Sequence, residues 1–347
     1  MKTLRGCTVL ATIFVLSSLI AGCKSTPNSN EPANTGTGPQ DSELLDQADA
    51  FFRAKRYHRA ITTYEQAAAQ AARDGAPSVQ VEAWAQLARC ASIDLRTGLP
   101  ASEVTDDSRR WFMKARDLAS KDWPKAWSRL LFVRGLLEYQ ARMYSTAQAT
   151  LKELFAYCEE KGLALRAIDA AYNLSWMSAV EDRPTWIERG IALAEHEKSD
   201  YWLSLLWQSA GEYHEVDAKD IKAALEAYGN ARRYFKILGE PHDILMSDWA
   251  YGRALRLNGR CDEAGNLLLD ARNAAETRFT EEEGDSFLEI AFISYEWGEY
   301  ALTKGAQDQA NEAFKRARQM IESVPPSEHW RRDEIAGAID KRLANAQ

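Results

Sequence analysis

Histidines are the side chains of this sequence with the widest chemical range, because imidazole can bind metals and transfer protons near neutral pH. There are five of them: His58, His196, His214, His242 and His329. None has a partner at metal-ligand spacing, and His214-Glu215 lacks the second histidine of a zinc-protease helix. The chain also has no glycine-rich phosphate loop and no nucleophile elbow. The sequence therefore predicts a protein that is not an enzyme and that uses no metal and no cofactor.

Arginines are the other side chains whose positions suggest chemistry, in this case the recognition of anions. Arg253 and Arg256 lie one helical turn apart in a chain of net charge −8, and we predict that they contact an anionic partner. The basic run from Arg53 to Arg59 is either a solvated turn or another anionic contact, with lipid or with a partner. The acidic balance argues against nucleic acid as the partner, because binding to phosphates needs a basic surface.

A repeated spacing of small and bulky residues indicates the elements that carry these side chains. Gly298 is followed by Ala310 after twelve residues, by Phe314 after sixteen and by Ala317 after nineteen. Small residues at these positions let two antiparallel helices approach closely. The bulkier residue sixteen positions after the glycine fills the groove beside them. The same offsets recur in three further copies: Ala48, Ala60, Tyr64 and Ala67; Gly252, Ala264, Leu268 and Ala271; and Gly135, Ala147, Leu151 and Leu154.

This pattern resembles the tetratricopeptide repeat (TPR) family, whose signature falls on the residues just named. The resemblance implies an all-α fold, an α-solenoid of about seven TPR-like helical hairpins over residues 43–325 with a capping helix over 326–347. The anchor positions lie 36 to 47 residues apart, against about 34 in a standard repeat, so another helix-pair solenoid stays open. One residue too many separates Gly211 from Ala224, which predicts a bulge or longer turn near Asp217.

The resemblance also implies where a partner would bind. In TPR arrays the first helix of each hairpin lines a concave groove that takes extended peptides or partner helices. The alternative is that the aromatic side chains on these helices pack between repeats. The residues that the resemblance places in the groove are Arg129, Phe132, Tyr139, Asn173, Trp176, Gln208, Glu212, Trp249, Arg253, Arg256, Tyr295 and Glu299.

The first 42 residues have the features of a targeting segment. Lys2 and Arg5 precede a mostly apolar run over 8–20, which is shorter than the about 20 residues of a membrane-spanning helix and is typical of a cleaved leader. The sequence Leu19-Ile20-Ala21-Gly22-Cys23 resembles the lipobox of bacterial lipoproteins. That resemblance implies a signal peptide over 1–22 and lipidation of Cys23. The polar stretch that follows, up to residue 42, predicts a disordered tether.

These observations favour a non-enzymatic, lipid-anchored scaffold that binds another cell-envelope protein or peptide. Lys24 after the lipidated cysteine favours the bacterial outer membrane, with the body in the periplasm, although a Gram-positive source would place the protein on the outer face of the plasma membrane. Two alternatives stay open, namely a glycan-binding lipoprotein with an aromatic groove and an envelope hydrolase with a site in the 97–105 loop. Cys90, Cys158 and Cys261 allow at most one disulfide, and free thiols are an equal alternative.

Overall fold

The computed structural model describes residues 43–54, 56–93, 95, 101, 103–281, 287–323 and 332–344. The predicted leader, Cys23 and the tether lie outside these residues. The described chain is helical, without a β-strand, and it forms two compact units. We call described residues up to Ser209 the N-terminal unit and those from Ala210 onward the C-terminal unit. No helix of the described ranges has both the length and the apolar character that crossing a membrane requires.

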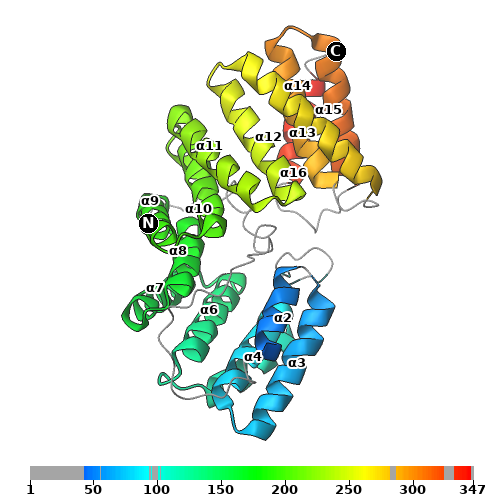
Figure 1. The fold of residues 1–347 in the computed structure, drawn as a ribbon. Helices are drawn as coiled ribbons and strands as arrows, with labels where there is room; N and C mark the ends of the chain where they lie inside the picture. The colour runs from blue at the N-terminus through cyan, green and yellow to red at the C-terminus, as the bar shows by residue number, and fades with distance from the viewer. Residues whose placement is uncertain are drawn as a thin grey trace. The chain divides into compact units, whose positions relative to one another are not determined.

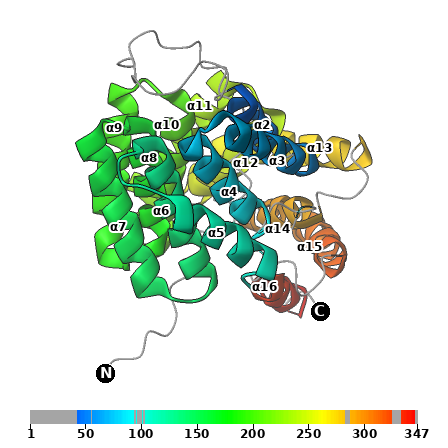
Figure 2. The same cartoon turned by 90° about the horizontal axis from the view of Figure 1, so that it is seen from below.

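The N-terminal unit consists of consecutive helices that pack in pairs (Figures 1 and 2). Proline opens the first turn of α4 and α6, where its missing N–H costs no helical hydrogen bond. The helix α10 (Asp200–Glu212) crosses into the second unit. The pairs are α2 (Glu43–Arg53) with α3 (Tyr57–Asp74), α4 (Pro77–Cys90) with α5 (Asp106–Leu118), α6 (Pro124–Gln140) with α7 (Tyr144–Lys161), and α8 (Ala164–Met177) with α9 (Arg183–His196).

The C-terminal unit continues the same succession of helices. A π-helical turn over Tyr213–Asp217 follows α10, and it is the longer turn that the spacing after Gly211 predicts. The other elements are α11 (Ile221–Leu238), the pair α12 (Pro241–Leu257) and α13 (Cys261–Glu281), the pair α14 (Phe287–Thr303) and α15 (Gln307–Glu322), and α16 (Arg332–Ala344). The last helix packs against α15 and α14, with Ile335 and Ile339 buried.

The contact between a small residue on one helix and a bulky residue on the next explains the repeat signature. A Cβ atom on Gly298 of α14 would lie 2.5 Å from Cε1 of Phe314 on α15, so a larger residue would push the two helices apart. The first copy uses alanine in the same way, because Ala48 and Ala60 are fully buried beside Tyr64. The described residues of each unit therefore form successive TPR-like hairpins of the α-solenoid class, and α16 follows the last hairpin as a capping helix.

Candidate functional site

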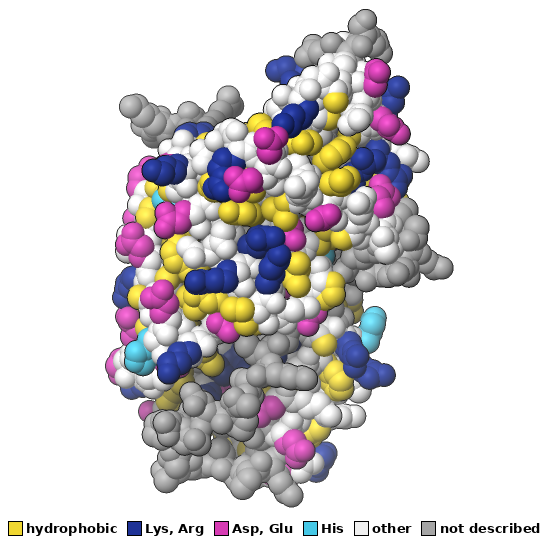
Figure 3. All heavy atoms as spheres, turned by 45° about the horizontal axis from the view of Figure 1, so that its top comes forward, with side chains coloured by type: hydrophobic (Ala, Val, Ile, Leu, Met, Phe, Trp, Pro, Cys, Tyr) yellow, Lys and Arg dark blue, Asp and Glu magenta, His cyan; other side chains and the backbone are white. Residues whose placement is uncertain are grey.

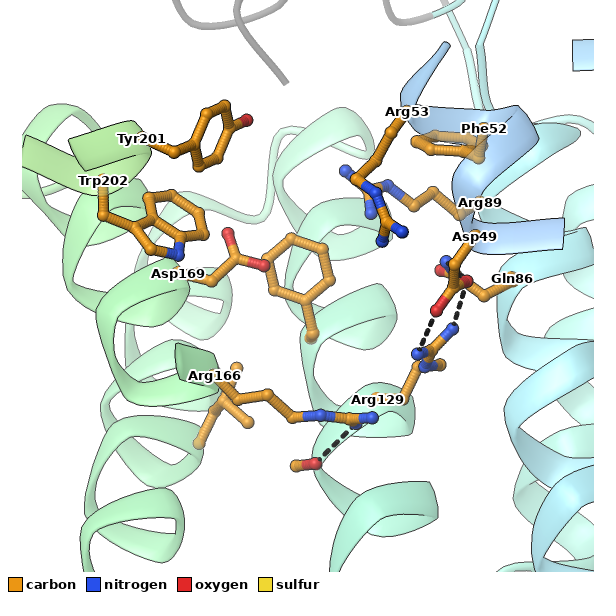
Figure 4. A pocket seen from close by; sticks show the side chains of 13 residues that line it. Asp49, Phe52, Arg53, Gln86, Arg89, Arg129, Arg166, Asp169, Tyr201 and Trp202 are labelled. Atoms are coloured by element: carbon orange, nitrogen blue, oxygen red, sulfur yellow. Dashed lines mark hydrogen bonds and ion pairs between the residues drawn. The ribbon is translucent and has the colours of Figure 1, made fainter. Parts of the chain in front are cut away.

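A pocket rich in arginine lies in the N-terminal unit, mostly on the first helices of its hairpins (Figure 4). Its volume is about 200 Å³, which suits a single side chain or a small anion. We call it the arginine pocket. It is lined by Asp49, Phe52 and Arg53 of α2, Gln86 and Arg89 of α4, Ser128, Arg129 and Phe132 of α6, Leu154 of α7, Arg166 and Asp169 of α8, and Tyr201 and Trp202 of α10.

The floor of the pocket is an ion pair between α2 and α6. Two nitrogens of Arg129, Nη1 and Nη2, donate to the two carboxylate oxygens of Asp49, each at 2.7 Å. The hydroxyl of Tyr64 also donates to Asp49 Oδ1 at 2.5 Å, and Gln86 Nε2 donates to it at 3.1 Å. Burial alone would raise the pKa of Asp49, but Arg129 and these hydrogen bonds lower it well below its usual range. Asp49 is therefore charged and fully engaged within the protein.

A second carboxylate, on α4, extends this network toward α8. Glu82 Oε2 accepts a hydrogen bond from Arg166 Nη2 at 2.9 Å, and it lies 3.1 Å from Arg129 Nε, with which it forms an ion pair. Arg166 Nη1 also donates to Ser128 Oγ at 2.8 Å and to the carbonyl oxygen of Lys125. Arg129 and Arg166 are thus matched by Asp49 and Glu82, and their charges are already balanced inside the unit.

Two further arginines enter the pocket from α2 and α4. Arg89 lies over the rings of Phe52 and Phe132, with its Cζ atom 4.6 Å and 5.0 Å from their centroids. Arg53 is exposed at the end of α2. Within the described part of the chain, neither guanidinium has a carboxylate at ion-pair distance, so the N–H groups of both remain available. Since guanidinium groups bind carboxylates and phosphates through paired hydrogen bonds, this side of the pocket can accept an anion.

The opposite wall is formed by α8 and α10, as Figure 4 shows. Asp169 accepts a hydrogen bond from Asn173 Nδ2 at 3.0 Å, and Trp202 beside it packs on Tyr172 with ring centroids 5.8 Å apart. Burial raises the pKa of Asp169 to about 6, against the opposing attraction of Arg89 and Arg166. The pocket therefore holds basic, acidic and aromatic groups close enough together for one bound side chain to contact all three.

A buried acceptor on α4 completes the description of the pocket. Gln86 donates through Nε2 to both Asp49 and the hydroxyl of Tyr64, which fixes the orientation of its amide. Its Oε1 atom is buried and has no hydrogen-bond partner. An unmatched buried acceptor costs free energy, and this one lies beside the hydrogen bonds that Gln86 makes to Asp49 and Tyr64.

The C-terminal unit carries a comparable row of charges on its first helices, which we call the C-terminal ladder. Arg253 forms an ion pair with Glu215, with Nη2 and Oε1 2.6 Å apart, and Arg256 Nε pairs with Glu296 Oε1. From the capping helix α16, Arg342 forms a bidentate pair with Glu299 of α14 at 2.5 and 2.6 Å. Three arginines thus meet three carboxylates: Glu215, Arg253, Glu296, Arg256, Glu299 and Arg342.

The structure brings together only part of the predicted groove. Arg129 and Phe132 line the arginine pocket, and Asn173 touches it through Asp169. Arg253 and Arg256, predicted to bind an anionic partner, have carboxylates of their own protein as partners. Half-buried Tyr139 packs edge-on against Trp176, and Tyr295 against Phe314. The remaining predicted residues are buried: Trp176, Gln208, Glu212, Trp249 and Glu299. The binding role of the predicted set stays a prediction.

The tryptophans of the predicted groove do not form an open platform for sugars. Trp176 and Trp249 are only 8% and 7% exposed, and Trp249 stacks on Phe292. They pack between repeats, which is the alternative that the sequence left open. For the third hypothesis, a hydrolase, part of the 97–105 loop lies outside the described residues. The described ends of that loop are held by Gln140, whose Nε2 donates to the carbonyl oxygens of Ser92 and Ala101 at 3.1 and 2.6 Å.

Sequence reasoning placed only Arg129 and Phe132 of the lining residues in a groove, and among those that it missed are Arg53, Arg89, Arg166, Asp169 and Trp202. The groove residues were predicted only from their offsets along the chain from the small anchor residues. This choice selects residues close to the contact between the two helices of a hairpin. A useful signal was the charge spacing on first helices, where Asp49 and Arg53 are four residues apart and Arg166 and Asp169 are three apart. Arg53 had been noted only as part of the basic run, whose contact with an anion was one of two alternatives.

The other reactive side chains of the described residues are dispersed. Among these residues, no group of three or more His, Cys, Asp or Glu could hold a metal ion. Cys90 and Cys158 are buried free thiols, and Cys261 is a partly exposed one. On the face drawn in Figure 3, Lys and Arg side chains are interspersed with Asp and Glu side chains over the described residues.

Comparison with known proteins supports the fold. No protein-family model matches this chain, and no curated protein matches it by sequence. A signal-transduction ATPase from Pyrococcus horikoshii with a tetratricopeptide repeat sensor is similar in structure, at 12% identity and a TM-score of 0.54. The match covers 89% of this chain and 44% of that one. Yeast Tom70 matches with 12% identity and a TM-score of 0.42, over 90% of this chain and 67% of that one.

At such low identity the similarity to the Pyrococcus protein speaks for the fold alone. Together with the hairpin contacts it shows an all-α protein of TPR-like architecture. The TPR-like assignment agrees with the resemblance that the sequence carries, and the chain spans less than half of the Pyrococcus protein's length. What this chain binds must be argued from its own residues.

Proposed function

We propose that this protein is a non-enzymatic scaffold that binds a protein partner through an acidic side chain seated in the arginine pocket. The observation that carries the proposal is the pair Arg53 and Arg89, whose guanidinium groups enter a pocket without a carboxylate partner among the described residues. The pocket volume of about 200 Å³ matches one side chain, so a segment of a protein fits the site as an anchor inserted from outside.

The surroundings of the two arginines support this choice of ligand. Arg129 and Arg166 are already paired, so they give the pocket a rigid basic floor while Arg53 and Arg89 remain available. The apolar side chains Phe132 and Leu154 line the same pocket and would exclude water around the bound carboxylate. Electrostatic attraction between a partly dry guanidinium and a carboxylate is stronger than the same contact in open water.

Peptide binding by the purified full-length protein tests the proposal. Two fluorescein-labelled octapeptides are compared, one with Glu and the other with Gln at alternate positions. We expect fluorescence anisotropy to show binding of the Glu peptide and not of the Gln peptide. Replacing both Arg53 and Arg89 by alanine should weaken binding at least about tenfold, since hydrogen bonds to charged groups contribute about 1.5–3 kcal/mol each.

The matched control is Arg56→Ala, which removes a charge from the same basic run but from an exposed position outside the pocket. It should leave the affinity within about twofold, as for a distant surface charge screened by salt. Equal binding of the two peptides, or an equal loss in the double variant and in the control, would overturn the proposal.

For the cell we propose that the scaffold is lipid-anchored through Cys23 at the bacterial outer membrane and that its partner is another envelope protein. The lipobox resemblance of residues 19–23 is the support, because two or three acyl chains suffice for stable anchoring. The change Cys23→Ser should move the protein from the membrane fraction to the soluble fraction and abolish incorporation of labelled palmitate. Retention in the membrane would contradict the anchor.

A photo-cross-linking residue at position 53 would identify the envelope partner. The same residue at Ile237, which is 60% exposed in the C-terminal unit, serves as the control position. A protein captured at position 53, absent at position 237 and displaced by the Glu octapeptide would be the expected partner. Capture that the Glu peptide does not displace would exclude the pocket as the binding site.

A further inference from the structure

Asp169 shares the arginine pocket with Arg53 and Arg89 but lies on the opposite wall, on α8 (Figure 4). Its carboxylate accepts one side-chain hydrogen bond, from Asn173 at 3.0 Å. Over the described ranges, no guanidinium or ammonium group lies within ion-pair distance of it. An anion held by Arg53 and Arg89 would therefore face a carboxylate that the protein has not neutralised.

The second carboxylate of the pocket behaves in the opposite way. Asp49 accepts from Arg129, Tyr64 and Gln86, and its pKa lies well below the usual range. Asp49 thus keeps its charge at every pH at which the protein is expected to work. Of the two carboxylates in one pocket, only Asp169 is able to respond to a change of pH near neutrality.

The charged and titratable groups around Asp169 come from six helices, and they include Arg53 of α2 and Tyr201 of α10. Arg89 of α4, Arg129 of α6 and Arg166 of α8 attract its charge, yet burial is the larger effect and raises its pKa to about 6. From α7, Cys158 is a buried thiol, and burial raises its pKa to about 12, so it stays neutral. No histidine is among the residues that line the pocket. Asp169 is therefore the group that titrates there between pH 5 and 8.

We propose that the arginine pocket binds its anion together with a proton, which Asp169 takes up. The inference rests on the proposed function, because it concerns the same pocket. A carboxylate from the partner repels an ionised Asp169, and protonation removes the repulsion while Arg53 and Arg89 stay available to the anion. Thermodynamic linkage then requires that acidification tightens binding, by at most about tenfold per pH unit for one proton. In a compartment whose pH varies, the scaffold would hold its partner more firmly under acid conditions.

The test uses an octapeptide in which cysteic acid replaces Glu, because a sulfonate keeps its charge between pH 5.5 and 7.5. We expect the affinity of the full-length protein for this peptide to rise about tenfold from pH 7.5 to 5.5. In Asp169→Asn the affinity should vary less than about twofold and should equal the wild-type value at pH 5.5. The control Asp46→Asn removes a carboxyl of α2 whose pKa is also raised but that lies outside the pocket, and it should keep the wild-type pH dependence.

A second measurement does not depend on any variant. Calorimetry at pH 6.5 in buffers of different ionisation enthalpy counts the protons that the wild-type protein takes up with the peptide. Uptake of a fraction of one proton supports the proposal. Binding of equal strength at both pH values, without proton uptake, would overturn it and leave the proposed function standing. Absence of binding at either pH would overturn both.

Discussion

The arginine pocket and the C-terminal ladder use the same positions of a repeat in two different ways. Both are rows of arginines and carboxylates on first helices of hairpins. In the C-terminal ladder three arginines meet three carboxylates, and every charge has a partner. Around the arginine pocket Arg129 and Arg166 pair with Asp49 and Glu82. Arg53, Arg89 and Asp169 also line the pocket, and none of the three has an ion-pair partner among the described residues.

The difference between the two regions separates arginines that stabilise the fold from arginines that are available to bind a ligand. A buried charge must be paired, because an unpaired one costs several kcal/mol. When all charges of a row are paired, removing one of them damages the fold. When guanidinium groups at a cavity are in excess, the surplus is open to a ligand, and removing it should change binding more than stability.

The change Glu296→Ala should break the C-terminal ladder with the largest effect. Glu296 is buried and pairs with Arg256, while Arg253 lies within 4.0 Å. Without Glu296 the charges of Arg253 and Arg256 are no longer fully matched by carboxylates. The free energy of unfolding should therefore fall by about 3–5 kcal/mol. Chemical denaturation followed by circular dichroism measures the loss. In the control Glu263→Ala, an exposed ion pair with Arg260 is removed, and the change should stay below about 1 kcal/mol. Similar effects in the two variants would contradict the structural role of the ladder.

Paired substitutions of arginine sharpen the comparison directly. Arg256→Ala should lower the free energy of unfolding by about 2–4 kcal/mol, because Glu296 then remains buried without its closest partner. Arg89→Ala removes a guanidinium that contacts only aromatic rings among the described residues and should cost about 1 kcal/mol. Binding of the Glu octapeptide should respond in the reverse order. Equal stability losses would mean that the two arginines have the same role.

The change Asp169→Asn should alter stability less than the two changes in the C-terminal ladder, by an amount that depends on pH. Folding raises the pKa of Asp169 from about 4 to about 6. The contribution of Asp169 to stability is therefore fully present below about pH 4, and it is lost as the pH rises through about 6. The variant should therefore be more stable than the wild type at pH 7.5, by on the order of 1–2 kcal/mol after allowance for partial solvent access. At pH 4 the two proteins should unfold together. Thermal denaturation across this range decides, and a variant that is less stable at pH 7.5 would contradict the raised pKa.

The hairpins were predictable because their signature acts locally. Gly298 and Phe314 belong to adjacent helices, and their sizes set how closely these helices can pack. The extra residue after Gly211 likewise produced a π-helical turn where the sequence placed one. The residues that line a groove were harder to predict, because the first helices of neighbouring hairpins also pack on each other. Trp176 and Trp249 carry the residue type of a binding site, yet both are buried in those contacts.

The sequence by itself determined the repeat and the all-α fold. Only the tertiary structure decided which charges are satisfied. Arg129 pairs with Asp49 across 80 residues, and Arg256 pairs with Glu296 across 40. Such pairs form only after packing fixes the distances between helices, and the strength of an ion pair depends on distance and burial rather than on position along the chain. For that reason the sequence could not show that Arg253 and Arg256 have carboxylate partners in their own protein, or that Arg53 and Arg89 line a pocket without an ion-pair partner among the described residues.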